Sequence, residues 1–265
     1  MTTGLGNYFG TGGVRWISDR EFIYTVFSGE SKPSLKALDI VTNHTRQIVQ
    51  GSICWNLAVS PDRSRIAFTS DRSGKIDVWT SDVNGGDLRQ VTHAAIGGTS
   101  ISFFPDNRNI AYVTFGNQQA VWRSSIDGDG APVRLTDRPA NTPQVSPDGN
   151  SLLCRYRTVE NGLPLWRTAI LPVGGTEPPR YYPIPRSGGP HVFQWLANGR
   201  SFAFIDSTNG ASNVFVQDVA GGPPRQLTQF DSGRIDSYHV SPNGKWIVVA
   251  RGDPVNDMVL IRGFR

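Results

Sequence analysis

Short apolar runs alternate with turn residues along the whole chain. The clearest examples are VSPDRSRIAF at residues 59–68, VSPDGNSLLC at residues 145–154 and VSPNGKWIVV at residues 240–249. In each of them Ser-Pro-Asp or Ser-Pro-Asn, a combination that favours a tight turn, separates two apolar runs. The pattern predicts a repeated strand–turn–strand unit, and such internal repetition decides the choice of fold.

The turn residue recurs at a nearly constant interval. WISDREFIYT, FFPDNRNIAY and WLANGRSFAF align with the three clear copies, which places the turn residue at Asp19, Asp62, Asp106, Asp148, Asn198 and Asn243. Successive positions differ by 43, 44, 42, 50 and 45 residues, which is the period of a four-stranded propeller blade. The sequence therefore predicts an all-β, six-bladed β-propeller of four-stranded antiparallel blades.

Each unit contains four short apolar segments, most clearly between residues 55 and 92. NLAVS, RIAFTSD, IDVWTSDV and LRQVT are the expected strands, and PDRS, RSGK and NGG are the expected turns. Val, Ile, Phe and Trp suit strands, whereas Gly, Asn, Asp and Pro suit turns. By the same alignment Trp16, Val59, Phe103, Val145, Trp195 and Val240 share one position of the innermost strands, and we expect them in the core.

The last unit ends after three strands. DMVLIRG, at residues 257–263, is its third strand, and no fourth follows. The first residues, MTT, match the end of the RQLT strand that closes other units. We therefore expect the N-terminal residues to complete the last blade and remove an open edge. On this interpretation residues 1–265 are a single propeller domain, excised from a longer protein.

Composition excludes several classes of function. The net charge is only +4 and the basic residues are scattered, which is typical of a solvated surface rather than a nucleic-acid face. No stretch of about 18 apolar residues is present, so the chain is not expected to insert into a membrane. Cys54 and Cys154 have no metal-ligand spacing and are expected to be buried as small apolar residues.

The repeat resembles the TolB-type β-propeller repeat, a relative of the WD repeat. SDRSGKIDVWTSDVNGGDLRQVT at residues 70–92 carries the resemblance most clearly, and six copies cover the chain. Similar propellers occur as periplasmic TolB-type proteins, as gates of prolyl-oligopeptidase-like enzymes and as C-terminal domains of bacterial serine/threonine kinases and winged-helix regulators. TTGLGNY at the start and DMVLIRGFR at the end look most like the last group. The resemblance thus implies a bacterial signalling protein with an upstream effector domain. The upstream sequence decides whether the propeller is periplasmic or cytoplasmic.

Catalytic motifs are missing from the sequence. No GxSxG turn presents a nucleophile, and none of the four histidines forms an HExxH or HxH pair. DGDG at residues 127–130 occupies the hairpin position between the third and fourth strands, so we interpret it as a turn. We therefore expect neither enzymatic activity nor a metal or other cofactor.

The candidate binding residues lie in the segments that enter the innermost strands. In a propeller these loops, and those between the second and third strands, gather at one mouth of the channel. Their aromatic and polar side chains suit a protein, a peptide or a small polar ligand. The candidates are Tyr8, Trp55, Asn56, Asn141, Gln144, His191, Gln194, Asp236, Tyr238 and His239.

Three functions remain open at this point. The first is a non-catalytic sensor or recognition domain of a signalling protein. The second is a periplasmic TolB-like scaffold for protein interactions, and the third is the propeller gate of a peptidase or a hydrolase with its site in the channel. For the first, we expect Trp55 and Tyr238 to anchor the ligand and to be replaceable without loss of folding.

Overall fold

A computed structural model provides the fold. It describes residues 2–3, 13–26, 33–50, 55–93, 100–116, 119–174, 177–183, 192–208, 210–253 and 255–262. The described residues form strands and turns only, and no helix among them could span a membrane. The chain is a propeller of four-stranded antiparallel blades, as expected from the sequence.

Five sheets are each built from four consecutive strands. Blade 1 contains β2 (Val14–Trp16), β3 (Glu21–Val26), β4 (Ser34–Asp39) and β5 (Thr45–Val49). Blade 2 contains β6 (Trp55–Val59), β7 (Arg65–Ser70), β8 (Asp77–Asp82) and β9 (Arg89–Gln90). Blade 3 contains β10 (Ile101–Phe103), β11 (Asn109–Thr114), β12 (Ala120–Ser125) and β13 (Val133–Arg134). Blade 4 contains β14 (Ala140–Val145), β15 (Ser151–Glu160), β16 (Leu163–Pro172) and β17 (Arg180–Tyr182). Blade 5 contains β18 (Phe193–Trp195), β19 (Ser201–Thr208), β20 (Ala211–Asp218) and β21 (Arg225–Gln226).

The remaining sheet combines the two ends of the chain. It contains β22 (Arg234–Val240), β23 (Trp246–Asp253), β24 (Val255–Arg262) and β1 (Thr2–Thr3), in the order β22-β23-β24-β1. Thr2 pairs with Val259 and Thr3 pairs with Met258. The first described residues therefore supply the outermost strand of the sheet that contains the last ones.

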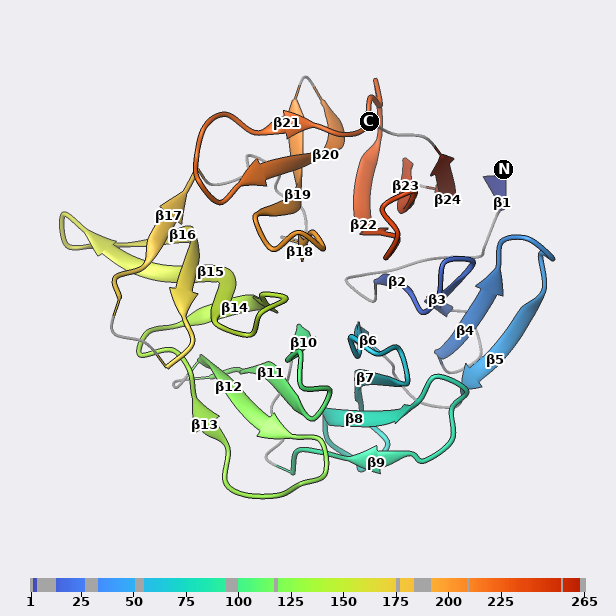
Figure 1. Cartoon of the computed structure of the whole chain (residues 1–265), viewed down its shortest axis with the longest axis horizontal. Coiled ribbons are helices and arrows are strands. Elements are labelled where there is room, and N and C mark those ends of the chain that lie inside the picture. Colours follow the sequence, from blue (N-terminus) through green and yellow to red (C-terminus); the bar gives the residue numbers. More distant parts are fainter. Residues whose placement is uncertain are drawn as a thin grey trace.

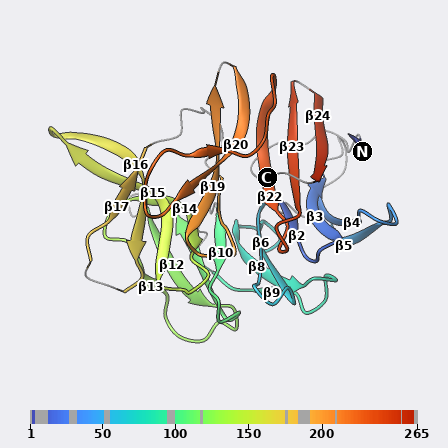
Figure 2. The same cartoon turned by 45° about the horizontal axis from the view of Figure 1, so that its top comes forward.

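The sheets are arranged around a central axis, with the first strand of each unit innermost (Figure 1). β2, β6, β10, β14, β18 and β22 surround this axis, and the fourth strands lie at the rim. The tilted view in Figure 2 shows the blades standing side by side, with the hairpin of β15 and β16 projecting from the rim. The innermost strands β2 and β22 lie next to each other although they belong to opposite ends of the chain.

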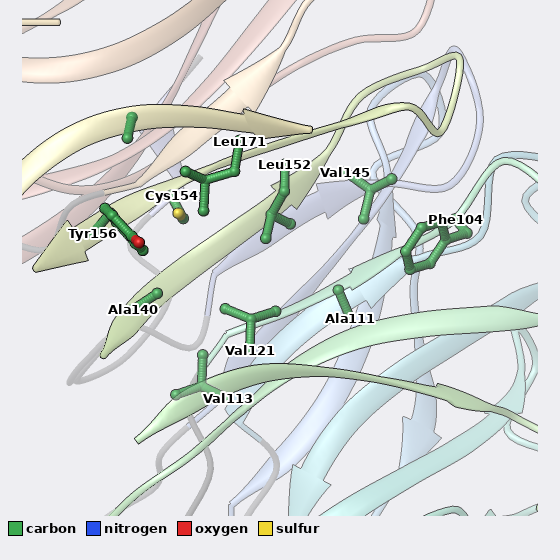
Figure 3. Close-up of a cluster of buried hydrophobic side chains, with 11 residues drawn as sticks. Phe104, Ala111, Val113, Val121, Ala140, Val145, Leu152, Cys154, Tyr156 and Leu171 are labelled. Carbon is green, nitrogen blue, oxygen red and sulfur yellow. The ribbon is translucent and has the colours of Figure 1, made fainter. Parts of the chain in front are cut away.

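Apolar side chains fill the spaces between neighbouring blades. Between blades 3 and 4, Val113 and Val121 face Leu152 and Cys154, all of them excluded from solvent (Figure 3). Burial raises the pKa of the Cys154 thiol, which therefore stays protonated and inert. The prediction for Cys154 is confirmed, whereas Cys54 lies outside the described residues.

The Ser-Pro-Asp turns are held by their own side chains. In blade 2 the Ser60 hydroxyl donates to Asp62 Oδ1 (2.6 Å) and accepts the backbone N–H of Arg65 (3.0 Å). Blade 4 repeats this arrangement, and the β22 sheet has Asn243 in place of the aspartate. The repeated serines therefore stabilise turns, as the sequence predicted, and this local chemistry explains why the motif recurs.

A second repeated network joins the third strand of a blade to the end of its fourth strand. In blade 2 the Thr92 hydroxyl donates to Asp77 Oδ1 (2.8 Å) and accepts the Val78 N–H (2.9 Å). In blade 5 the Thr228 hydroxyl donates to Asn213 Oδ1 (2.9 Å) and likewise accepts a strand N–H. The threonine that ends the RQVT and RQLT segments thus attaches the short outer strand to the third strand of its blade.

Candidate binding site in the central channel

The predicted site residues do not converge on one surface. Tyr8 and His191 lie outside the described residues, and Trp55 is described only as part of β6. The others all lie on innermost strands. Asn56, Asn141 and Asp236 are near the start of these strands, whereas Gln144, Gln194 and His239 are near their end.

Tyr238 is a core residue, which does not favour the expectation that it anchors a ligand. Its side chain is fully excluded from solvent and packs with Ile235 and Val249. Burial raises the pKa of its phenol well above the usual range. The inward and outward positions alternate along β22, and Tyr238 points into the interface with blade 5 rather than into the channel.

Two further candidates are occupied by contacts between neighbouring sheets. Gln194 Oε1 accepts the Val240 N–H (2.8 Å), and its amide donates to the Val240 carbonyl (3.1 Å). His239 Nδ1 accepts the Trp16 N–H (3.3 Å). An innermost strand has no ladder partner on its inner edge, so its buried N–H groups need acceptors from side chains of the preceding sheet.

These contacts define a channel column, the residue four positions before each turn residue. It consists of Arg15, Ala58, Ser102, Gln144, Gln194 and His239. Ser102 follows the same rule, because its hydroxyl accepts the Val145 N–H of blade 4 (3.0 Å). In three sheets, therefore, the polar side chain of the column primarily joins one sheet to the next.

The start of the innermost strands carries unusual backbone conformations. Gly13, Asn56, Ser100 and Thr142 have φ values of 81°, 53°, 63° and 51°. Positive φ is rare for a β-branched residue such as Thr142 and costs conformational energy. Asn141 Oδ1 and Thr142 Oγ1, at this bulge in β14, are buried and have no hydrogen-bond partner among the described residues. Such strain and unpaired polar atoms are typical of functional segments.

Asn56 and Asp236 are less suited to ligand contact. Asn56 is 5% exposed and donates to the Thr69 hydroxyl (3.3 Å) within its own blade. Asp236 is half-buried and lies 3.1 Å from Arg234 Nε. Burial raises the pKa of Asp236, and Arg234 opposes this shift.

A cavity of about 250 Å³ opens at the end of the innermost strands. Five of the six innermost strands contribute to it: β2, β6, β10, β14 and β22. Its polar side chains include Arg15, Gln144 and His239 from the channel column and Arg63 from the turn after β6. A second cavity of about 450 Å³ lies between blade 5 and the β22 sheet and shares His239 with the first.

Both cavities lie at the other end of the innermost strands from the predicted site. They lie where the innermost strands turn into the second strands, because Pro61 and Pro242 of these turns line them. The starts of the innermost strands are at the opposite end. Trp195 is correspondingly half-buried rather than fully buried as expected, because it lines the second cavity, whereas Trp16 is buried at 1% exposure as predicted.

Arg15 and Arg63 were missed by the sequence analysis. The sequence alone could have pointed to Arg15, because the channel column is found by counting back four residues from each turn residue. Arg15 is the one fully charged member of this column. Arg63 has a φ of 60° at a position where later turns have Asn107, Gly149, Gly199 and Gly244. Arginine is less suited than Asn or Gly to this conformation.

The electrostatics of the first cavity are dominated by these two arginines. Burial, and then the charges of Arg15 and Arg63, hold the pKa of His239 well below its usual range. His239 is therefore neutral at pH 7, and because Nδ1 accepts a backbone N–H its own proton must be on Nε2. Within the described residues, no group of three or more His, Cys, Asp or Glu side chains could hold a metal ion.

Comparisons with known proteins agree on the fold. TolB from Acinetobacter baumannii superimposes with a TM-score of 0.70 at 17% identity, covering 95% of this chain and 67% of that one. The chain has a TolB-like β-propeller fold. An oligogalacturonate lyase in complex with manganese is similar at a TM-score of 0.62 and 14% identity, covering 97% of this chain and 74% of that one. A Mycobacterium tuberculosis puromycin-hydrolysing peptidase matches at a TM-score of 0.62 and 16% identity, covering 91% and 41%.

No family model matches the sequence. The similar structures include a lyase and a peptidase as well as TolB. Identities this low establish the fold alone, and one propeller fold supports many functions.

Proposed function

We propose that this chain is a non-catalytic binding propeller whose ligand site is the cavity at the end of the central channel. Its six sheets would be the blades of a closed ring, with β1 completing the last one. The partner is a protein, a peptide or a small polar ligand that reaches into the channel.

The observation that carries this proposal is the composition of the cavity wall. Residues from five innermost strands, far apart in the sequence, line one cavity with both apolar and polar groups. Ile101 and Phe103 provide apolar surface, whereas Arg15, Gln144 and His239 provide directed polar groups. A concave apolar surface with a few convergent polar groups is typical of ligand sites.

The state of His239 supports binding rather than catalysis. Ser102 and His239 both line the cavity, so a serine and a histidine lie in one site. A histidine base must accept a proton from the serine, but Nδ1 of His239 already accepts the Trp16 N–H and Nε2 carries the proton. Ser102 in turn accepts the Val145 N–H. Neither residue has the environment of a nucleophile and base pair.

An equilibrium binding screen combined with turnover assays tests the proposal. We expect members of a library of metabolites and short peptides to raise the melting temperature of the domain, while ester, peptide and phosphate ester substrates remain unchanged. For a hit, Gln144→Ala should weaken binding about tenfold, since buried polar contacts to a ligand contribute on this scale. The matched control is Gln50→Ala, because Gln50 is exposed and lies outside the cavity wall. Turnover that depends on Ser102 or His239, or hits that are unaffected by Gln144→Ala, would contradict the proposal.

We further propose that the domain serves a bacterial signalling protein as its recognition module, with an upstream effector such as a protein kinase. The resemblance of the repeat to such domains supports this role. The coding sequence upstream of the chain tests it. An effector domain is the expected result, and a signal peptide alone or a hydrolase domain downstream would instead support the scaffold or the peptidase gate.

A further inference from the structure

The first cavity has a strong imbalance of charge. Arg15 and Arg63 belong to its wall, and no Asp or Glu is among the described residues that line it. Arg63 has an ion pair with Asp19, whose carboxylate is 4.0 Å from Nη1 and more than half exposed. A contact this long and this exposed neutralises little of the arginine charge.

The backbone at Arg63 gives independent support for a role of this side chain. Asn107, Gly149, Gly199 and Gly244 occupy the same turn position with positive φ, as the geometry favours. Arg63 adopts the same conformation, with a φ of 60°, and therefore carries a conformational cost that asparagine or glycine would avoid. Its side chain reaches the cavity and contributes to the electrostatics of His239.

Hydrogen-bond donors accompany the charge. His239 lines the cavity, and because its Nδ1 accepts the Trp16 N–H, the neutral ring has its donor proton on Nε2. Gln144 adds a side-chain amide to the same wall. Arg15 is positioned from β2, where one of its Nη1 hydrogens is donated to the Val14 carbonyl (2.9 Å). Two guanidinium groups and neutral donors form the kind of environment that suits an oxygen anion.

We propose that the first cavity binds an anionic oxygen group. This group is a carboxylate or a phosphate of a small ligand or of a partner's side chain. This inference rests on the proposed function and specifies the ligand class of the same site. A volume of about 250 Å³ accommodates such a group with a short carbon skeleton. The apolar wall of Ile101 and Phe103 would contact that skeleton.

Titration with simple probes tests the ligand class. The melting temperature and the dissociation constant are measured with sodium phosphate and with sodium succinate, against sodium chloride of equal ionic strength. The neutral probe is succinamide. We expect phosphate or succinate to raise the melting temperature in a saturable manner, and the better of the two identifies whether phosphate or carboxylate is preferred. Succinamide and chloride should have no such effect.

Matched arginine variants locate the site. Arg63→Asn suits the turn geometry and should weaken binding of the preferred anion by about tenfold, the typical effect of losing one charge-assisted contact. Arg15→Gln should do the same from another strand. The control is Arg108→Asn in the turn of blade 3, since Arg108 is exposed and lies outside the cavity wall. If Arg15→Gln does not fold, Arg63→Asn and the control still decide the question.

The outcomes separate this inference from the proposed function. Anion binding that is equal in Arg63→Asn and in the control would overturn the anion site, and so would the absence of any anion-specific shift. If succinamide binds and Gln144→Ala abolishes this binding, the anion inference is wrong but the binding function stands. Turnover of a probe would contradict the proposed function itself.

Discussion

At the scale of single residues, the channel column shows why chemically equivalent side chains differ in role. Gln144 and Gln194 occupy the same position of the repeat, and the sequence marks both as candidates. Gln194 is bonded twice to Val240 of the next sheet, whereas Gln144 lines the first cavity. The local sequence pattern could not predict which side chain accepts a backbone N–H of an innermost strand. That depends on which residue of the neighbouring sheet lies opposite the N–H group.

His239 leads to a prediction about pH. Its pKa is lowered in the folded state by burial and by Arg15 and Arg63, so the unfolded chain binds more protons once the pH falls below about 6.5. The stabilising contribution of neutral His239 is thus complete above that pH and decreases as the pH falls toward the lowered pKa. Protonation would also remove the acceptor of the Trp16 N–H.

His239→Gln isolates this effect. Glutamine provides a non-titrating acceptor, as Gln194 does for Val240. We expect the free energy of unfolding of the wild type to fall more steeply between about pH 7 and pH 5 than that of His239→Gln, as measured by urea unfolding. His44→Gln, at an exposed position, should retain the wild-type slope. Parallel slopes for wild type and His239→Gln would show that His239 titrates normally.

At the scale of elements, the turns and strand endings were predictable because their chemistry is local. The serine and the aspartate of each Ser-Pro-Asp turn bond within the same motif. The bulges at the start of the innermost strands were not predictable. Thr142 has a positive φ although threonine disfavours it, so tertiary packing overrides local preference there.

The Asp77–Thr92 network yields a second prediction. Thr92→Val removes the hydroxyl that joins Asp77 to the Val78 N–H, all within a region that is nearly inaccessible to water. Leaving these buried groups unpaired should lower the free energy of unfolding by about 1–3 kcal/mol. Asp77→Asn should cost less, because Asn213 performs the same role in blade 5. Equal losses in the two variants, measured by thermal unfolding, would contradict this interpretation of the network.

At the scale of the whole molecule, the periodicity of the turn residues predicted the propeller of four-stranded blades. It did not predict which end of the channel would contain the cavity. That position depends on side-chain size around the central axis, since Ala58 and Ser102 are small members of the channel column beside Arg15 and His239. Only the folded propeller brings these positions together, because they come from separate repeats.

The central claim is that ligands bind in the first cavity and are not chemically converted there. The most direct measurement is a ¹⁵N–¹H NMR titration of the tryptophan indoles with hits from the binding screen. Trp16 lines the cavity and donates its indole N–H to the His239 carbonyl (3.0 Å), whereas Trp122 donates to Thr114 within blade 3. We predict that the Trp16 indole signal moves saturably, that the Trp122 signal stays in place and that the ligand signals keep their intensity. A stationary Trp16 signal in the presence of bound ligand, or the appearance of product signals, would contradict the account.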